Sequence, residues 1–400
     1  MIIQPAKRTE CVKEYYFSVK NKEMAKLNAE RLSRGEDRII NLGIGAPDGM
    51  PPLSAIQTLA TEAAKPGVHA YQSYTGIPEL REALARWYKR YYGVTLDPAT
   101  EIQPLVGSKE GILILSLTFL NPGDKVLVPD PGYPTYTSST LLCEAEMVPY
   151  RLCPEKKWQP DFEALEQMDL TGVKMMWTNY PNMPTGAPAS EELYQKIVDF
   201  ARRHHILVVN DNPYSFVLND RPLSIFGAEG ARECCLELNS LSKAHNMSGW
   251  RVGMVAGDAD MIREILKVKS QMDSGMFRPL QLAAVSALDE GEDWFRALNA
   301  EYRRRKEVVW KIFDRLGATY DLDSQGLFVW GKLPEKTIEE AVGTGKTPGE
   351  LISDRLLYGC GVFITPGFVF GSSCGNYIRS SLCNPVEKLE SALAKVSSIV

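Results

Sequence analysis

The central part of the chain alternates short apolar segments with longer amphipathic ones. Five short runs predict buried strands: Lys125 to Val128, Ala145 to Pro149, Val173 to Thr178, Ile206 to Asn210 and Cys234 to Leu238. Short apolar strands that alternate with helices are typical of a mostly parallel sheet covered on both faces. Ligands of such sheets bind at the carboxyl ends of the strands.

The segments between the strands have helical periodicity. In the stretch from Glu191 to His204, apolar residues fall on one face, Ser190 precedes the first turn as an N-cap, and glutamates follow it. Further helices are predicted from Pro78 to about residue 92, over residues 112–120 and over residues 21–33, after a mobile start.

The pattern changes toward the C-terminus. Helices dominate from Asp260 to about Leu316, and short strands and helices then alternate over residues 319–400. A chain of 400 residues is long for one core, so two domains are expected. The sequence therefore predicts an α/β fold with a mostly parallel central sheet and a smaller α/β lobe. The large domain is placed at residues 46–289, and the small domain at residues 1–45 and 290–400.

Composition narrows the class of protein. The net charge is -5, and no block of basic residues suggests nucleic acid or a membrane as a partner. We expect no signal peptide and no membrane-spanning segment. The eight cysteines include no CxxC pair, so neither a metal site nor a disulfide framework is expected. These features favour a cytoplasmic enzyme with reduced, mostly buried thiols.

One lysine stands out beside a predicted buried strand. Lys243 lies in the run Asn239 to Gly253, a few residues after the segment that ends at Leu238. An unpaired ammonium in apolar surroundings is disfavoured, so such a lysine either reaches solvent or forms an imine with an aldehyde cofactor. Neighbouring serines and Arg251 have the chemistry to hold a phosphate. A solvated loop lysine is the alternative interpretation.

Other polar residues follow the predicted strands. Asp211 closes one strand, and Tyr214 comes three residues later. A carboxylate there serves as a turn former, or it keeps a pyridine nitrogen protonated. The turn at residues 178–186, TNYPNMPTG, offers asparagine donors. Gly107-Ser108-Lys109 precedes a helix, whose free N–H groups bind anions, and Tyr133 is able to stack on a flat ring.

The order and spacing of these residues resemble the class I/II aminotransferases, the fold-type I enzymes that use pyridoxal 5'-phosphate. The resemblance runs from about Ile40 to the C-terminus. Its most specific pieces are Ser240-Leu241-Ser242-Lys243 with Arg251 at a fixed offset, and Asp211 with Tyr214. It implies a three-layer sandwich and a homodimer with shared active sites.

The resemblance also implies a role for each residue. Lys243 would form the imine with the cofactor and move protons, Asp211 would pair with the pyridine nitrogen, and Tyr214 would contact the phenolate oxygen. Tyr133 would stack on the ring. The phosphate would be held by Gly107, Ser108, Lys109, Ser240 and Arg251, and by Tyr71 of a neighbouring subunit. Arg379 would bind the substrate α-carboxylate beside Gly45.

One position departs from the family pattern. The residue directly before Pro-Thr-Gly is usually asparagine, whereas here it is Met183, with Asn182 one step earlier. A thioether cannot donate a hydrogen bond. Either Asn182 contacts the phenolate through a shifted turn, or the phenolate relies on Tyr214 alone.

The predicted function is a ping-pong transfer of an amino group from an L-amino acid to a 2-oxo acid. The alternative is a C–S lyase or another non-transaminating enzyme of the same fold, because fold and cofactor do not determine the reaction. A regulator is disfavoured, since about forty residues before the fold leave no room for a DNA-binding domain. The YPN-x-PTG turn and GIGAPD are most similar to the branch with LL-diaminopimelate, alanine and aspartate enzymes.

Overall fold

The computed structural model describes residues 2–399 and is built around a seven-stranded sheet. The strand order is β2-β8-β7-β6-β5-β3-β4, and within this sheet only β8 runs antiparallel to its neighbours. The strands are β2 (Ile102–Leu105), β3 (Lys125–Asp130), β4 (Glu146–Arg151), β5 (Val173–Thr178), β6 (Leu207–Asp211), β7 (Cys235–Ser240) and β8 (Gly253–Gly257).

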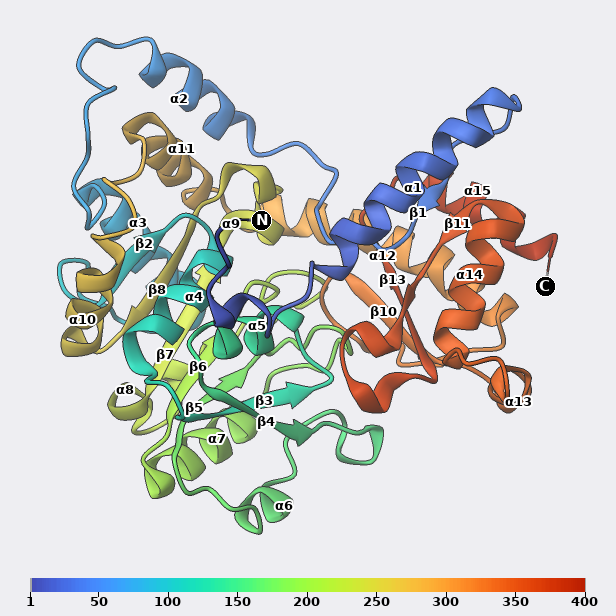
Figure 1. Cartoon of the computed structure of the whole chain (residues 1–400). Coiled ribbons are helices and arrows are strands. Elements are labelled where there is room, and N and C mark those ends of the chain that lie inside the picture. Colours follow the sequence, from blue (N-terminus) through green and yellow to red (C-terminus); the bar gives the residue numbers. More distant parts are fainter. Residues whose placement is uncertain (1, 400) are drawn as a thin grey trace.

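Helices cover both faces of this sheet (Figure 1). One layer consists of α4 (Ser108–Phe119), α5 (Pro134–Leu142) and α10 (Ala259–Lys269). The opposite layer consists of α3 (Pro78–Tyr92), α7 (Glu191–His204), α8 (Ala231–Cys234) and α11 (Arg278–Leu288), with α2 (Leu53–Ala63) packed on α11. Side chains alternate between the layers as a strand requires: Val255 packs with α4, whereas Met254 and Ala256 pack with α3 and α11. The result is a three-layer sandwich.

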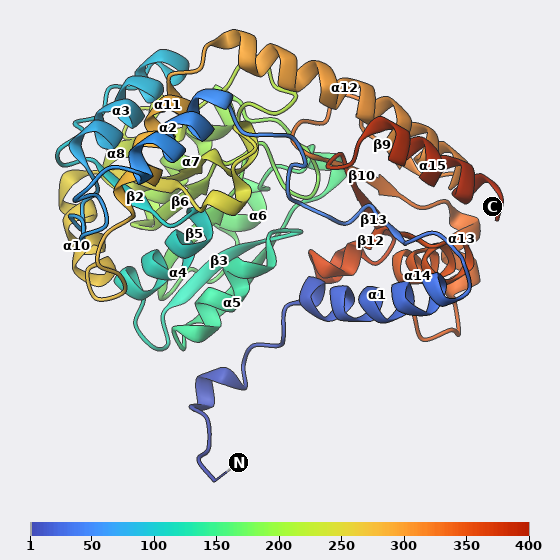
Figure 2. The same ribbon diagram turned by 90° about the horizontal axis from the view of Figure 1, so that it is seen from above.

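Both ends of the chain build a second, smaller part beside the sheet. It contains α1 (Tyr16–Ser33), β1 (Ile40–Asn41), β9 (Thr319–Tyr320), β10 (Phe328–Lys332), α13 (Glu335–Ala341), α14 (Pro348–Cys360), β11 (Val362–Phe363), β12 (Thr365–Pro366), β13 (Tyr377–Ser381) and α15 (Val386–Ser397). β1 pairs in parallel with β11, which joins the two chain ends. The long helix α12 (Glu292–Arg315) runs along both parts, as Figure 2 shows.

Most predicted elements of the sheet lie within two residues of the observed ones, and the predicted α/β class with a mostly parallel sheet is confirmed. The Ser190 hydroxyl accepts a hydrogen bond from Leu193 N at 3.0 Å, as expected of an N-cap. The helix predicted from residue 21 begins at Tyr16. Cys234 is helical rather than the start of a strand, and its Sγ lies 3.8 Å from that of Cys235. All eight cysteines are free.

Candidate active site

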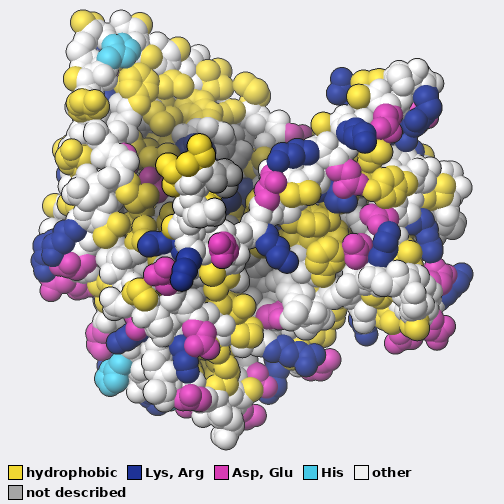
Figure 3. Space-filling view, viewed as in Figure 1, with side chains coloured by type: hydrophobic (Ala, Val, Ile, Leu, Met, Phe, Trp, Pro, Cys, Tyr) yellow, Lys and Arg dark blue, Asp and Glu magenta, His cyan; other side chains and the backbone are white. Residues whose placement is uncertain are grey.

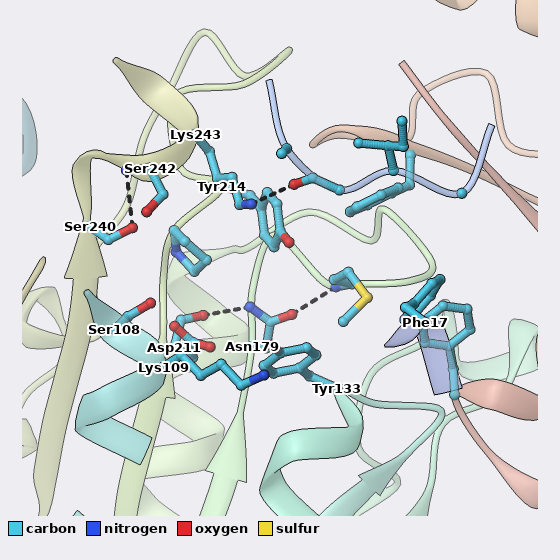
Figure 4. A pocket seen from close by; sticks show the side chains of 18 of the residues that line it. Phe17, Ser108, Lys109, Tyr133, Asn179, Asp211, Tyr214, Ser240, Ser242 and Lys243 are labelled. Atoms are coloured by element: carbon cyan, nitrogen blue, oxygen red, sulfur yellow. Dashed lines mark hydrogen bonds between the residues drawn. The ribbon is translucent and has the colours of Figure 1, made fainter. Parts of the chain in front are cut away.

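A cavity of about 530 Å³ lies where β5, β6 and β7 end. It brings together residues from the sheet, from the N-terminal segment and from the C-terminal part, which Figure 4 shows from close by. Among the predicted residues, those that line it are Gly45, Ser108, Lys109, Tyr133, Asp211, Tyr214, Ser240, Lys243, Arg251 and Arg379. Residues more than 300 positions apart in sequence therefore share one site.

Lys243 belongs to a short helix, α9 (Leu241–Ala244), directly after β7. Its Nζ reaches into the cavity and donates a hydrogen bond to the Gly45 carbonyl oxygen at 2.5 Å. Burial lowers the pKa of Lys243, and the positive charges of Arg251 and Arg379 act in the same direction. No carboxylate forms an ion pair with it among residues 2–399. A lysine in such surroundings is held toward its neutral, nucleophilic form.

Asp211 is the last residue of β6, and its carboxylate is buried. Oδ2 accepts a hydrogen bond from the Tyr136 hydroxyl at 2.8 Å, whereas Oδ1 has no partner among the described residues. Tyr136 is itself fixed by stacking on Trp177, with ring centroids 4.9 Å apart. Burial raises the pKa of Asp211 to about 6, although the Tyr136 hydrogen bond and the charge of Lys243 lower it. The free oxygen suits a cationic ring nitrogen.

The opposite polar end is formed by the first turn of α4 and the region around α9. Ser108, Ser240, Ser242 and Arg251 line this end of the cavity. Gly107 does not line it, but its φ is +80° and a Cβ there would lie 2.2 Å from Arg251 Nη2. Glycine is therefore required for the guanidinium to lie against this backbone. The free N–H groups of the α4 N-terminus, three hydroxyls and a guanidinium form a site suited to a phosphate.

Two tyrosines face the middle of the cavity. Tyr133 caps α5 and meets the Tyr136 ring edge-on, with centroids 5.6 Å apart. Tyr214 meets the Phe328 ring at 6.0 Å, and burial raises its pKa, so its hydroxyl stays protonated. In Figure 4 the Tyr214 ring lies beside Lys243, and the Tyr133 ring lies on the other side of Asn179, next to Lys109. Lys109 Nζ lies 6.0 Å from the centre of the Tyr133 ring and 4.5 Å from that of Tyr15.

Arg379 lies on β13, buried between two aromatic rings. Its guanidinium carbon is 3.9 Å from the centre of Phe328 and 4.4 Å from that of Phe370. Nη2 donates to the Gly43 carbonyl oxygen at 3.2 Å, and Nε has no hydrogen-bond partner within residues 2–399. Burial lowers the pKa of Arg379 to about 10, so it remains charged at neutral pH. A buried guanidinium without a carboxylate partner is suited to bind the carboxylate of a ligand.

The Asn182 side chain, in the turn after β5, does not point into the cavity as the first predicted alternative required. The Asn182 amide bonds within the turn: its Nδ2 donates to Asn179 O at 3.2 Å, and its Oδ1 accepts from Thr185 Oγ1 at 2.7 Å. Asn182 does not line the cavity, whereas Asn179 and Met183 do. Asn179 Nδ2 donates to Asp211 O at 2.5 Å, and Met183 Sδ lies 3.4 Å from Arg379 Nη1. Contact of Asn182 with the cavity through a shifted turn is therefore not observed.

Tyr71 lies outside this cavity. Its side chain is 89% exposed in the loop before α3, so any contact with a cavity would be with that of another subunit.

Most apolar residues of the cavity were missed from the sequence, and Met183 was noted only as a departure from the family pattern. We call Tyr15, Phe17, Ile44, Met183, Phe328 and Phe370 the apolar wall; all six line the cavity. Tyr136 and Asn179 were also missed. The aromatic pattern Tyr15-Tyr16-Phe17 at the start of α1 was the available signal. An aromatic residue on a helix is usually part of a core, which is why the pattern alone did not indicate a site.

Residues 2–399 contain neither a cluster of metal ligands nor a membrane-spanning helix. No group of three or more His, Cys, Asp or Glu side chains there is arranged to hold a metal ion. None of the helices within this range has the length and apolar character that crossing a membrane requires.

Comparison with known proteins agrees with this geometry. The family model for aminotransferase class I and II matches residues 37–396. An LL-diaminopimelate aminotransferase of Dehalococcoides mccartyi is 39% identical over 98% of each chain, and one of Nitratidesulfovibrio vulgaris is 38% identical over 94% of each. The solved structure of apo-BacF from Bacillus subtilis has 33% identity and a TM-score of 0.91 over 100% of this chain and 98% of that one.

These matches extend over nearly the whole chain and confirm the predicted membership in the class I/II aminotransferases. The chain belongs to the class I and II aminotransferases, and it is a transferase that moves an amino group from an L-amino acid to a 2-oxo acid.

Proposed function

We propose that this cavity holds pyridoxal 5'-phosphate and that the chain transfers amino groups by a ping-pong reaction in which Lys243 is the covalent and proton-transferring residue. The observation that carries the proposal is a pair of groups in one cavity: Lys243, whose pKa is lowered and which has no carboxylate partner among the described residues, and buried Asp211, whose Oδ1 is free there. The family depends on this cofactor, and the donor set fits it.

Each part of the cofactor has a matching group in the chain. Asp211 would pair with the pyridine nitrogen, and Tyr133 would cover one face of the ring. Tyr214 would donate to the phenolate oxygen; Met183 cannot. The α4 N-terminus, Ser108, Ser240 and Arg251 would hold the phosphate, next to Gly107 and Lys109. When bound, the cofactor stabilises negative charge that develops on the substrate α-carbon.

Lys243 and Arg379 then divide the work of the reaction. When it is not bound to the cofactor, Lys243 would be a neutral amine that takes the proton from the substrate α-carbon and later gives a proton back. Its low pKa favours this role, because a protonated amine cannot accept a proton. Arg379 holds the substrate α-carboxylate, so the substrate presents its α-hydrogen to Lys243, a positional effect.

The assembly is proposed to be a cytoplasmic homodimer. Tyr71 is 89% exposed and would reach the phosphate site of the partner. Exposed apolar side chains at the start of α2 (Met50 and Leu53) and before α11 (Phe277) support an interface on this side. Figure 3 shows hydrophobic side chains gathered over α2 and α11. A division into residues 46–289 and residues 1–45 with 290–400 fits the two sets of sheets.

Two candidates for the substrate follow from separate observations. The matched relatives are LL-diaminopimelate aminotransferases, which favours that substrate and the branch indicated by the sequence. The residues of the cavity favour another class, which is argued below.

The reaction is tested by its need for an acceptor. The purified holoenzyme is incubated with an L-amino acid, with and without 2-oxoglutarate. We expect sustained turnover with the acceptor and a single turnover without it. Sustained release of pyruvate and ammonia without an acceptor would show the alternative, a C–S lyase, and would contradict the proposal.

A further inference from the structure

The apolar wall is the feature of this cavity that bears on which amino acid it accepts. Its six residues come from the N-terminal segment, the turn after β5 and the C-terminal part. Four of them contact the Arg379 guanidinium: Phe17, Met183, Phe328 and Phe370. In Figure 4 Phe17 lies at the end of the cavity away from Ser108, Ser240 and Ser242. A substrate whose carboxylate meets Arg379 therefore has aromatic and aliphatic surface around it.

Few charged groups are left for the distal end of a substrate. Within the described residues, the charged side chains that line the cavity are Lys109, Asp211, Lys243, Arg251 and Arg379. Asp211, Lys243 and Arg251 have roles toward the cofactor, and Arg379 takes the α-carboxylate. Lys109 Nζ rests over the Tyr15 and Tyr133 rings at 4.5 Å and 6.0 Å. The described lining thus offers a distal ammonium no free carboxylate.

The loop that carries Tyr71 is proposed to reach a partner's cavity, and residues 269–278 lie beside it, because Gln72 N donates to Ser274 O at 3.3 Å. The charged side chains of this second segment have partners of opposite charge. Arg278 Nη2 is 2.9 Å from Glu79 Oε1, and Lys269 Nζ is 2.5 Å from Asp273 Oδ2, so these charges are already matched. These loops also expose four large apolar or aromatic side chains: Tyr71, Tyr74, Met272 and Phe277.

We propose that the amino donor of this site is an L-amino acid with a single carboxylate and an apolar or aromatic side chain, rather than diaminopimelate or another substrate with a charged distal end. This inference rests on the proposed function, because it assumes that Arg379 receives the α-carboxylate. An apolar side chain gains by leaving water against Phe17, Phe328 and Ile44. A distal ammonium placed there would lose hydration without a carboxylate partner, because the one carboxylate of the lining is Asp211.

The kinetic test uses the holoenzyme with 2-oxoglutarate as acceptor. The kcat/KM for L-phenylalanine or L-leucine is expected to exceed that for LL-diaminopimelate at least about tenfold. A kcat/KM for LL-diaminopimelate equal to or above both would overturn the inference and leave the proposed function standing. Failure of all three donors to react would contradict both.

A binding test separates substrate choice from turnover. Calorimetry on the cofactor-free protein compares 3-phenylpropanoate with heptanedioate, the carbon skeleton of diaminopimelate. The Kd of 3-phenylpropanoate is expected to be at least about tenfold lower. Equal or tighter binding of heptanedioate contradicts an apolar distal pocket.

Two variants locate the preference in the wall. Ile44→Asp places a carboxylate at a position that is 37% exposed and tolerant of change; it is expected to lower the ratio of kcat/KM for L-phenylalanine over LL-diaminopimelate at least about tenfold. Phe17→Leu should lower that ratio by a smaller factor. Phe162→Leu, on α6 (Phe162–Glu166) away from the cavity, is the matched control and should leave it unchanged. Ratios unchanged in both wall variants would overturn the assignment.

Discussion

The two ends of the cavity differ in what builds them. The cofactor end is polar. Its residues lie on β6, β7, α4 and α9, which belong to the seven-stranded sheet and the helices that follow its strands. The substrate end is the apolar wall, with Arg379 embedded in it, and it comes from both ends of the chain and one turn. We propose that the cofactor end determines the reaction, because its groups match the parts of one cofactor. We propose that the substrate end selects the amino acid through packing.

If the cofactor end carries the chemistry, its loss should have the largest effect. Lys243→Ala removes both the covalent link and the proton acceptor, and kcat should fall by about 10⁴-fold or more. The steady-state rate of 2-oxo acid formation measures it. Lys267→Ala, an exposed lysine paired with Glu264, is the control and should keep full activity. Comparable losses in both variants would contradict the role of Lys243.

Loss of the Asp211 carboxylate should have the next largest effect. Asp211→Asn removes the charge that keeps the ring nitrogen protonated, and kcat should fall on the order of 10²–10³-fold. A nearby opposite charge shifts a pKa by about 1–3 units, so the ring nitrogen of the bound cofactor should lose its proton at correspondingly lower pH. A pH titration of the absorbance of the bound cofactor measures this shift in pKa. An unchanged titration would place Asp211 away from the ring.

The same carboxylate should destabilise the cofactor-free protein. Its pKa is about 6 when folded, against 3.8 as the ordinary value. Between these values the folded state binds more protons, so stability falls as pH rises from about 4 to about 6 and stays lower above it. Two units correspond to about 3 kcal/mol. Urea unfolding of cofactor-free Asp211→Asn should therefore show higher stability than the wild type at pH 7, and no gain at pH 3.5. The opposite sign would mean that Asp211 has an ionic partner.

The substrate end should respond through affinity. Arg379→Lys keeps the charge and loses the planar fork, which costs about 1.5–3 kcal/mol, or roughly 10–150-fold in kcat/KM. KM should rise more than kcat falls, and the cofactor absorbance should stay the same. A change in absorbance without a change in KM would move Arg379 to the cofactor end.

The smallest effect is expected at a residue outside both ends. Asn182→Ala removes hydrogen bonds from a buried turn and should lower stability by about 1–3 kcal/mol. The cofactor absorbance and KM should not change, because the Asn182 side chain does not line the cavity. A shift of the absorbance maximum would restore its predicted contact with the phenolate.

The sequence was informative at the cofactor end because its residues sit at strand ends. Asp211 and Ser240 close apolar runs, and Lys243 follows at a fixed offset, so local pattern and position in the sheet agree. The substrate end gave no such signal. Phe17, Phe328 and Phe370 are far apart in sequence, and each has the pattern of a core residue. Whether the Asn182 side chain reaches the cavity could not be predicted, because the direction of a side chain in a two-proline turn depends on the backbone conformation.

The site of covalent attachment is the most direct measure of this account. The holoenzyme is reduced with borohydride, digested, and searched by mass spectrometry for a phosphopyridoxyl group. We predict that the group is found on Lys243, in the peptide that follows β7. A label on another lysine, or a fully loaded enzyme without a label on Lys243, would contradict it.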